Sequence, residues 1–420
     1  MTPTEERAQL LAWIDAERDV LVAFLSRFVR AASPNPPGDT RAAARVIEEW
    51  LAQAGLTVRT IAPRAEMPNL VAYFDGARPG RHLVLNGHLD VFPCDDADRW
   101  QHPPWSGEIA RGRVYGRGVS DMKNGTAALL FAFGWLSRLA GRLPGRVTYT
   151  AVSDEETGGT WGAQYLVDHH PEVLGDCLLN AEPGAPTTVR FGEKGILRAA
   201  VVVDTPGCHG AYTHKSPSAT RIAARIAGEL AAIDALPVTM DAAVEHTLDA
   251  AAAEIDRVHV RGAAQVIKRF TLNIGVVRGG VKVNMLPGTC RLECDVRVPV
   301  GETAEKALAC MRAIAARHPH ARVELMSFTD PNWSDPGHAM VDHLRQACAD
   351  ACGFSPFAIT SLGATDARIW RAKGVPAYTY GTTATNVAMP DEHTDITEWI
   401  GVVKTLTLAA HAYLHTEAYS

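Results

Sequence analysis

The chain has 420 residues and a mass of 45.2 kDa, which is more than one ordinary hydrophobic core supports and therefore predicts two domains. Hydrophobic residues make up 47% and charged residues 21%, a composition that excludes long disordered stretches. The 41 Lys and Arg against 47 Asp and Glu give a formal net charge of −6. This charge argues against nucleic acid or an anionic membrane surface as the main partner.

The N-terminus and the cysteines indicate a cytoplasmic protein. Acids occur throughout the first thirty residues, and no basic segment followed by an apolar one predicts an export signal. No run approaches the roughly 18 uncharged apolar residues of a membrane helix. The eight cysteines contain no CxxC pair, so we expect free thiols, mostly buried, rather than a zinc ribbon or a disulfide framework.

The first half of the chain predicts helices alternating with strands. An amphipathic helix is expected over 4–31, ended by the prolines of SPNPPGD, and a second one over 40–55. Apolar runs then predict strands in NLVAYFDG, HLVLNGHLD and RVTYTAVSDEE, and further helices over 123–140 and 161–170. This alternation predicts a mostly parallel sheet flanked by helices, with its chemistry at the carboxyl ends of the strands.

The pattern changes near Gly195. From there the order is strand, helix, strand, strand, helix, strand, which is typical of a small ferredoxin-like sandwich, with an Ala-rich helix over 240–258 inserted. After Thr329 the helix–strand alternation resumes. The fold class is therefore predicted as α/β, with a catalytic domain formed by residues 1–194 and 330–420 and an inserted α+β lid formed by residues 195–329.

His88 and Asp90 close the run LVLNGHLD. Alternation along a strand puts both side chains on one side, so the Asp90 carboxylate can orient the His88 ring. The same pattern is also typical of a structural histidine near a turn. Asp121 lies in GRGVSDMKNG, whose glycines indicate a tightly constrained loop entering a helix, and it is either a site carboxylate or a helix N-cap.

Glu155 and Glu156 follow the strand TYTAV. Because neighbouring acids repel each other, an ordered pair favours a compensating cation, with one carboxylate binding metal and the other serving as general base. A solvated acidic turn is the alternative. Glu182 ends the run LLNAEPG, either as a site acid or as an exposed acid before a proline turn.

Four separate strand ends thus present His, Asp, Glu–Glu and Glu, spaced by roughly one strand–helix unit each, and coincidence at every one is improbable. A mixed nitrogen and oxygen set suits zinc, cobalt or manganese better than calcium. A carboxylate that bridges two ions is the arrangement of two-metal hydrolysis.

NGHLDVFP, GRGVSDMKNG and SDEETGG together resemble the M20 metallopeptidase and amidohydrolase family, and the resemblance covers nearly the whole chain. That family includes acetylornithine deacetylase, succinyl-diaminopimelate desuccinylase, aminoacylases and a carboxypeptidase. The resemblance implies that Asp90 orients a metal ligand, that Glu155 is the general acid and base, and that Asp121–Met122 is a cis peptide. It implies that two divalent ions, Zn²⁺ first and Co²⁺ or Mn²⁺ as alternatives, are held by His88, by Asp121 as the bridging ligand, and by Glu156 and Glu182.

The lid also resembles that family. The segment GCHGAYTHKSP resembles the family segment whose histidine reaches the partner subunit's active site and stabilises the oxyanion. The resemblance implies that His209 is this histidine, and His214 is the less well aligned candidate. KVNMLPG and DVRVP nominate Asn284 and Arg297 as substrate-binding residues; a capping Asn and a surface Arg are the alternatives. The resemblance thus implies a homodimer formed through the lid.

Backbone contacts to a substrate carboxylate are implied for Gly363 and Ala364 in SLGATDAR. The last metal ligand departs from the family's pattern. The family has a histidine two residues before Pro-Asp-Glu, and this chain has Ala388 there, with His393 directly after the tripeptide. We infer that a rearranged loop brings His393 to the second metal.

The sequence therefore predicts a dizinc hydrolase that cleaves the amide bond of an N-acyl amino acid, of the deacetylase or desuccinylase type. A metal-bridging water would lose its proton to Glu155, and the hydroxide would attack the carbonyl carbon. A metallo-dipeptidase or carboxypeptidase of the same family is the alternative. A third interpretation, supported only by Ala388, is a metal-dependent binding protein that has lost turnover.

Overall fold

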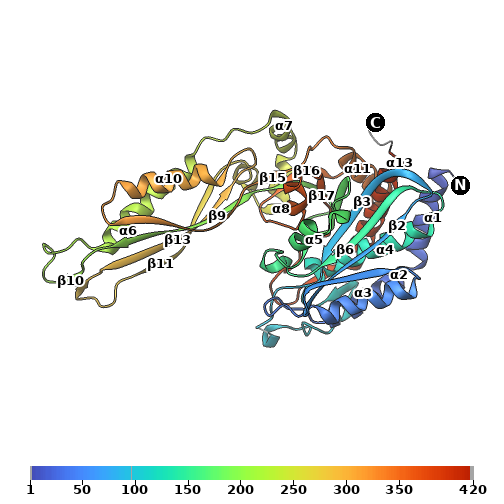
Figure 1. Ribbon diagram of the computed structural model, residues 1–420, viewed down its shortest axis with the longest axis horizontal. Coiled ribbons are helices and arrows are strands. Elements are labelled where there is room, and N and C mark those ends of the chain that lie inside the picture. The colour runs from blue at the N-terminus through green and yellow to red at the C-terminus, as the bar shows by residue number, and fades with distance from the viewer. Residues whose placement is uncertain (1, 96, 417–420) are drawn as a thin grey trace. The chain divides into compact units, whose positions relative to one another are not determined.

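The computed structural model describes residues 2–95 and 97–416. The chain divides into two compact units (Figure 1). The first contains the described residues of Met1–Phe191, Ser334–Ile359 and Thr365–Ser420, and the second contains Gly192–Trp333 and Thr360–Ala364. The unit boundaries fall near residues 191 and 333, and the assignment of catalytic and lid roles to the two units stays a prediction.

The first unit is built on a mixed sheet whose four central strands are parallel. Strands β6, β3, β7 and β17 run in one direction, and the strands beside them pair antiparallel. In spatial order the main path is β1 (Val58–Arg64), β2 (Met67–Asp75), β6 (Pro144–Val152), β3 (Arg78–His88), β7 (Cys177–Asn180), β17 (Ala377–Thr379) and β8 (Thr188–Glu193), with β16 (Phe357–Ser361) paired to β8. β15 (Asn332–Trp333) pairs with Gly192 and Glu193 at the end of β8, and these residues belong to the second unit. A small sheet joins β18 (His393–Asp395), β5 (Arg113–Tyr115) and β4 (Ile109–Ala110). The α/β fold class is confirmed.

Helices cover both faces of this sheet because the central strands are apolar on both sides. Val84 of β3 packs in a cluster with Leu166 of α5 and Trp370 of α12. The opposite face of β3 contacts α4 and α13. The helices of this unit are α1 (Pro3–Ala16), α2 (Arg18–Arg30), α3 (Arg41–Gln53), α4 (Asn124–Arg138), α5 (Ala163–His169), α11 (Ala339–Cys352), α12 (Ala367–Ala372) and α13 (Ile396–His415).

The helix expected over 4–31 is two helices, because the chain kinks at Glu17, where φ is −97° and ψ is 10°. The Glu17 carboxylate accepts hydrogen bonds from Trp135 Nε1 at 3.0 Å and from Arg138 Nη1 at 2.6 Å. Both partners lie on α4, so a tertiary contact holds the kink that the amphipathic pattern does not predict.

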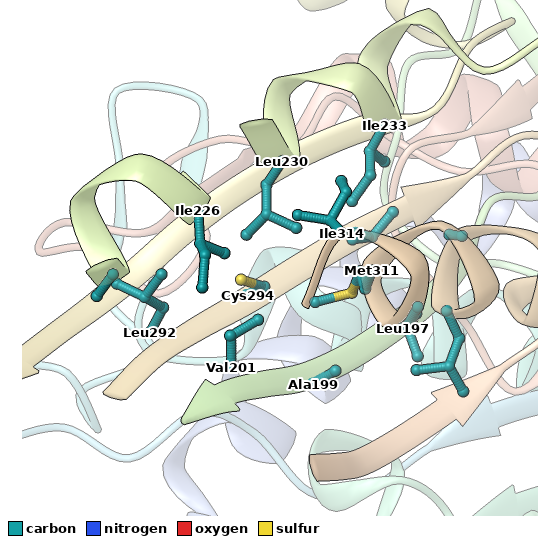
Figure 2. Close-up of a cluster of buried hydrophobic side chains, with 14 of the residues drawn as sticks. Leu197, Ala199, Val201, Ile226, Leu230, Ile233, Leu292, Cys294, Met311 and Ile314 are labelled. Carbon is teal, nitrogen blue, oxygen red and sulfur yellow. The ribbon is translucent and has the colours of Figure 1, made fainter. Parts of the chain in front are cut away.

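The second unit has the predicted strand–helix order. Its sheet runs β14, β9, β13, β11, all neighbours antiparallel, which is the ferredoxin-like order. Leu230 and Ile233, after α6, and Met311 of α10 cover one face of the sheet, against Val201 and Cys294 (Figure 2). The elements are β9 (Gly195–Asp204), β10 (Cys208–His209), α6 (Ala219–Glu229), β11 (Thr271–Gly279), β12 (Met285–Leu286), β13 (Thr289–Val298), α10 (Ala304–Ala316) and β14 (Ala321–Thr329).

The inserted helix expected over 240–258 is again interrupted, as α7 (Ala242–Ala250) and α8 (Ala252–His259), and a short helix α9 (Ala263–Val266) follows. All eight cysteines, which lie among the described residues, are free thiols, as expected. Across residues 2–95 and 97–416, the helices are too short or too polar to cross a bilayer.

Candidate metal centre

His88 ends β3 and is 1% exposed. Its Nε2 lies 3.3 Å from Asp121 Oδ1 and 3.3 Å from Glu182 Oε1, and among the described residues it makes no hydrogen bond of acceptable geometry. Its other nitrogen, Nδ1, lies 2.8 Å from the backbone oxygen of Asp90, which fixes the ring orientation. A buried, unpaired nitrogen that faces two carboxylates is the arrangement expected of a metal ligand.

The two acids reach His88 from neighbouring segments. Because β3 and β7 are parallel neighbours, Glu182 follows β7 at the edge of the sheet where His88 ends β3, and it is 6% exposed. Asp121 lies before α4 and does not cap it, since the N-cap residue of α4 is Lys123. The N-cap interpretation of Asp121 and the exposed-turn interpretation of Glu182 are therefore wrong.

The loop that carries Asp121 is held from two sides. Gly118 has φ of 79°, and a Cβ there would lie 2.0 Å from a methyl carbon of Val91, so only glycine fits. The buried Glu392 carboxylate accepts the backbone N–H of Ser120 at 2.9 Å and that of Asp121 at 3.3 Å. The Asp121–Met122 peptide is cis, as expected.

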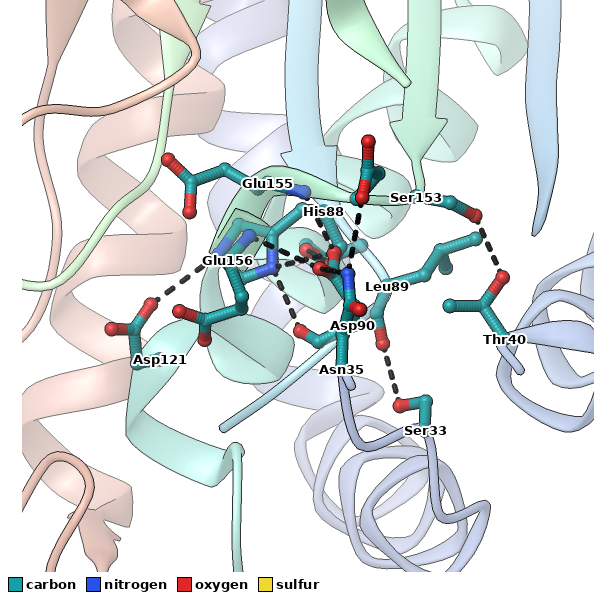
Figure 3. Close-up of polar contacts among 12 residues, drawn as sticks. Ser33, Asn35, Thr40, His88, Leu89, Asp90, Asp121, Ser153, Glu155 and Glu156 are labelled. Atoms are coloured by element: carbon teal, nitrogen blue, oxygen red, sulfur yellow. Dashed lines mark hydrogen bonds and ion pairs between the residues drawn. The ribbon is translucent and has the colours of Figure 1, made fainter. Parts of the chain in front are cut away.

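The side chain of Asp90 holds the loop of Glu155 and Glu156 through the backbone N–H groups of these two residues. Its Oδ1 accepts the N–H of Glu155 at 3.1 Å and its Oδ2 that of Glu156 at 3.1 Å (Figure 3). The Asp90 carboxylate lies 3.6 Å from His88 Nδ1, beyond a hydrogen bond. The expected orientation of the His88 ring therefore comes from the Asp90 carbonyl, and the carboxylate positions the two glutamates instead.

The carboxyl groups of Glu155, Glu156 and Glu182 lie next to one another, and burial raises their affinity for protons. Burial, with smaller contributions from neighbouring acids, raises the pKa of Glu155 to about 8 and that of Glu182 to about 8. Burial and then the Asp121 carboxylate raise the pKa of Glu156 to about 11. Burial opposes protonation of His88, but Glu182, Asp121 and Asp90 together raise the pKa of its ring well above its usual value. A solvated acidic turn does not describe Glu155 and Glu156.

These residues fit a divalent cation. One ligand atom each from His88, Asp121 and Glu182 lies within 4.8 Å of the other two. Oε1 of Glu156 is also buried, and within the described residues it has no hydrogen-bond partner. A cation would neutralise the excess negative charge and satisfy both orphaned atoms, and a nitrogen–oxygen donor set of this kind suits zinc and similar ions.

Three further residues of this region were not predicted from the sequence. Asn35 is buried at the end of SPN and donates from Nδ2 to Asp90 Oδ2 at 2.9 Å. Arg368 lies 3.6 Å from Glu155 Oε1 and donates to the carbonyl of Gly158 at 2.9 Å. Asp366 is 1% exposed, and neither of its carboxylate oxygens has a hydrogen-bond partner among the described residues. A polar residue between two structure breakers was the only sequence signal for Asn35.

His393 is half-buried on β18, which pairs with β5. Its Nδ1 lies 2.8 Å from the carbonyl oxygen of Asp391, which leaves Nε2 as the nitrogen available to a ligand. It is not among the three residues whose ligand atoms cluster around His88. Ala388 is exposed, with φ of 59°. The assignment of His393 as the last metal ligand stays a prediction.

The residues nominated for substrate binding all lie in the second unit, at two ends of its sheet. His209 pairs with Met285, and Gly210 donates its N–H to the carbonyl of Asn284 at 2.8 Å, so His209 and Asn284 are neighbours. Arg297 pairs with Ile196, near the opposite end of β9.

Gly363 is exposed and Ala364 is half-buried. They follow Ser361, whose carbonyl accepts the N–H of Lys194 at 3.1 Å, so they are at the Arg297 end of β9. His214 is exposed in the loop after β10.

The sequence model of the peptidase family M20/M25/M40 matches residues 84–412. The chain belongs to this family. Family membership makes it a metal-dependent hydrolase of amide bonds, and the resemblance noted from the motifs is confirmed. Over 369 residues the chain is 28% identical to a succinyl-diaminopimelate desuccinylase of Rhodopseudomonas palustris (strain TIE-1), covering 84% of this chain and 88% of that one.

Solved structures of family members share the fold. An M20 family metallo-carboxypeptidase from Sulfolobus solfataricus superposes with a TM-score of 0.79 at 18% identity, covering 94% of this chain and 99% of that one. A di-peptidase from Saccharomyces cerevisiae gives 0.75 at 15% identity, covering 99% of this chain and all of that one. At 18% and 15% sequence identity, the structural similarity is evidence about the fold. It shows that this M20 chain has the fold of the family.

Proposed function

We propose that this M20 chain hydrolyses the amide bond of an N-acyl amino acid, with a deacetylase or desuccinylase specificity, at a centre of two divalent ions. The observation that carries the proposal is the convergence of Asp121 and Glu182 on the unpaired Nε2 of His88. The desuccinylase relative, aligned over 84% of the chain, supports an acyl-amino-acid substrate.

In this proposal His88, Asp121, Glu156, Glu182 and His393 hold the ions. Zinc is proposed first because the donor set mixes nitrogen and oxygen. Ions bound there would polarise the amide carbonyl and make a water molecule acidic near neutral pH.

Glu155 is proposed as the general base and acid. Its backbone is fixed by Asp90, and Arg368 lies 3.6 Å from its carboxylate, so the side chain is held in a defined place beside the ligands. Glu155 takes the proton from the attacking water and returns it to the nitrogen of the leaving amine. General acid–base catalysis of this kind typically contributes about 10²–10⁴-fold.

The second unit is proposed to bind the substrate and to join two copies of the chain. Arg297 suits bidentate binding of a carboxylate, which lysine does not reproduce, and Gly363 and Ala364 would contact a carboxylate through their backbone. Between the pairs Arg297↔Ile196 and Thr289↔Asp204 the sheet extends eight residues, or about 26 Å. His209 and Asn284, beyond the far end, cannot serve the same substrate as Arg297 of their own chain, which supports a homodimer.

A dipeptidase is the second candidate, and Asp366 favours it. A dipeptidase must recognise a free ammonium group, and Asp366 offers a buried carboxylate without a hydrogen-bond partner among the described residues. Burial raises the pKa of the Asp366 carboxyl, and the charges of Arg368 and His88 counteract this rise. Asp366 therefore lies near the metal centre.

One experiment separates these functions. Purified protein loaded with Zn²⁺ is assayed against N-acetyl and N-succinyl amino acids and against dipeptides, with and without a chelator. Turnover of N-acyl substrates that is lost on chelation and in Glu155→Gln supports the proposal. Preference for dipeptides, abolished in Asp366→Asn, would support the second candidate. Absence of turnover in protein shown to be metal-loaded would contradict both.

A further inference from the structure

A second cluster of metal-binding side chains joins the first and last helices of the chain. His411 Nε2 lies 3.0 Å and His415 Nε2 lies 3.2 Å from the same oxygen, Oε2 of Glu6. Glu6 is 2% exposed and His411 is 1% exposed, while the side chain of His415 is 18% exposed. The cluster is therefore closed on the inside and reachable by solvent at one edge.

Helix geometry brings the two imidazoles together. His411 and His415 are four residues apart on α13, the spacing at which side chains lie on one helix face. Their ring centroids are 4.6 Å apart. Glu6 comes from the first turn of α1, and one ligand atom from each of the three residues lies within 4.8 Å of the other two.

The three side chains offer the groups that bind a transition metal, one carboxylate oxygen from Glu6 and one imidazole nitrogen each from His411 and His415. Metal binding uses the ionised carboxylate and the neutral imidazole form of such groups. The neighbouring cation, Arg7, is paired with Asp350.

The spacing is close to that of a metal's coordination shell. Ligands at zinc distances of about 2.0–2.2 Å in a tetrahedron lie about 3.3–3.4 Å apart. The two nitrogen–oxygen distances, 3.0 and 3.2 Å, need to lengthen by only a few tenths of an ångström. Both nitrogens also converge on one carboxylate oxygen, although two oxygens are available.

We propose that Glu6, His411 and His415 form a further site for a divalent transition-metal ion, zinc first, that clamps α1 to α13. Two histidines and a glutamate are a known zinc-ligand set. The site is distinct from the centre at His88, because α13 ends beside the start of β3, where Arg81 Nε donates to the carbonyl of Thr416 at 3.3 Å. Seven residues of strand, about 23 Å, separate Arg81 from His88.

The role that follows is structural. α13 packs against α4 and β3, and these two elements adjoin Asp121 and carry His88. An ion that ties α1 to α13 stabilises this assembly without touching the reacting groups. Its loss therefore lowers stability and leaves turnover at saturating substrate unchanged.

The test compares zinc content and thermal unfolding in full-length protein. Wild type, His415→Gln and Glu6→Gln are stripped, reloaded with Zn²⁺, desalted and analysed by elemental mass spectrometry. His343→Gln is the matched control, because His343 is a half-buried histidine of α11 whose Nε2 bonds Thr416 rather than Glu6. We expect one zinc fewer per chain in both cluster variants, a smaller zinc-dependent rise in Tm, unchanged kcat, and wild-type zinc content in the control.

A cluster held only by hydrogen bonds predicts a different result. Each variant would then lower Tm by the same amount with and without zinc, and zinc content would equal that of wild type. That outcome overturns the proposal. If Glu6→Gln does not fold, His415→Gln decides alone, because the side chain of His415 is partly exposed. Its zinc content and the zinc-dependent shift of its Tm are then the two measurements.

Discussion

The side-chain amide of Asn35 donates a 2.9 Å hydrogen bond to Oδ2 of Asp90. Asp90 in turn accepts the backbone N–H groups of Glu155 and Glu156, and Figure 3 shows the four residues in one network. The same amide lies 3.3 Å from Oδ1 of Asp154, in the loop just before the glutamates. Asn35 is therefore a positioning residue that acts on the proposed base through Asp90.

Asn35→Ala is expected to lower kcat by about tenfold or more, because a hydrogen bond to a charged group contributes about 1.5–3 kcal/mol. Metal content should stay at the wild-type value, since Asn35 binds no ligand residue directly. Steady-state kinetics and elemental analysis measure both. Thr407→Val is the control for stability alone, because it removes a buried hydrogen bond on α13, to Val403. Wild-type kcat in Asn35→Ala would remove the positioning role.

Arg368 is expected to set the acid side of the pH–rate profile. Burial and then the Asp366 charge raise the pKa of Glu155, and the cations His88 and Arg368 counteract them. Arg368→Met removes one cation, so the pKa of Glu155 rises. A base acts only when deprotonated, so the acid limb of kcat against pH should move to higher pH. In Lys373→Met, which removes a cation at the end of the same helix that is paired with Asp168, the limb should not move. An acid limb at the wild-type pH in Arg368→Met contradicts the assignment.

Metal-free protein is expected to lose stability as the pH rises from about 5 to about 8. Burial raises the pKa of Glu155 and Glu182 from 4.5 to about 8 in the folded chain. Between these values the folded state binds protons that the unfolded state has released, so the free energy of unfolding falls with pH. Urea unfolding of chelated protein at three pH values measures the slope. Zinc should flatten it, and Glu182→Gln should reduce it. Rising stability across this window would contradict the buried charge cluster.

The strand ends of the site could be predicted from sequence because the signal is local. An apolar run that ends at His88, or shortly before Glu155 and Glu156, places polar groups at the edge where parallel strands end. The same reasoning applied to Glu182, and the structure places it 3.3 Å from His88. The helix–strand alternation predicted the fold class, and the family motifs added the cis peptide at Asp121.

The supporting contacts could not be predicted because they join distant segments. Asn35 reaches Asp154 across 119 positions, and Arg368 reaches Gly158 across 210. The kink at Glu17 likewise depends on Arg138, 121 positions away. A periodic pattern of apolar residues carries no information about such pairs. The sequence therefore predicts one continuous helix over 4–31 and assigns no role to Asn35.

His393→Ala is expected to release one metal ion per chain. The segment before it is bonded to the Asp121 loop, where the Glu392 carbonyl accepts the N–H of Gly116 at 2.9 Å. His393 is thereby held near Asp121, the proposed bridging ligand. Elemental analysis gives the count, and His169→Ala, an exposed histidine of α5, serves as control. An unchanged number of bound ions in His393→Ala would exclude His393 as a metal ligand. If the double variant His393→Ala, Ala388→His regains the lost ion, a histidine at either position of this loop can complete the site.

Mixing two inactive variants tests whether His209 serves the partner's site. In a dimer of Glu155→Gln with His209→Ala, one site combines an intact Glu155 with the His209 of the other chain. An equal mixture after subunit exchange should recover about a quarter of the wild-type activity, because half the dimers are mixed and each has one complete site. Glu155→Gln mixed with Glu156→Gln is the control, since both residues belong to one chain's centre and no complete site forms. Recovery in both mixtures, or in neither after exchange is verified, would contradict the sharing of His209 across the two copies.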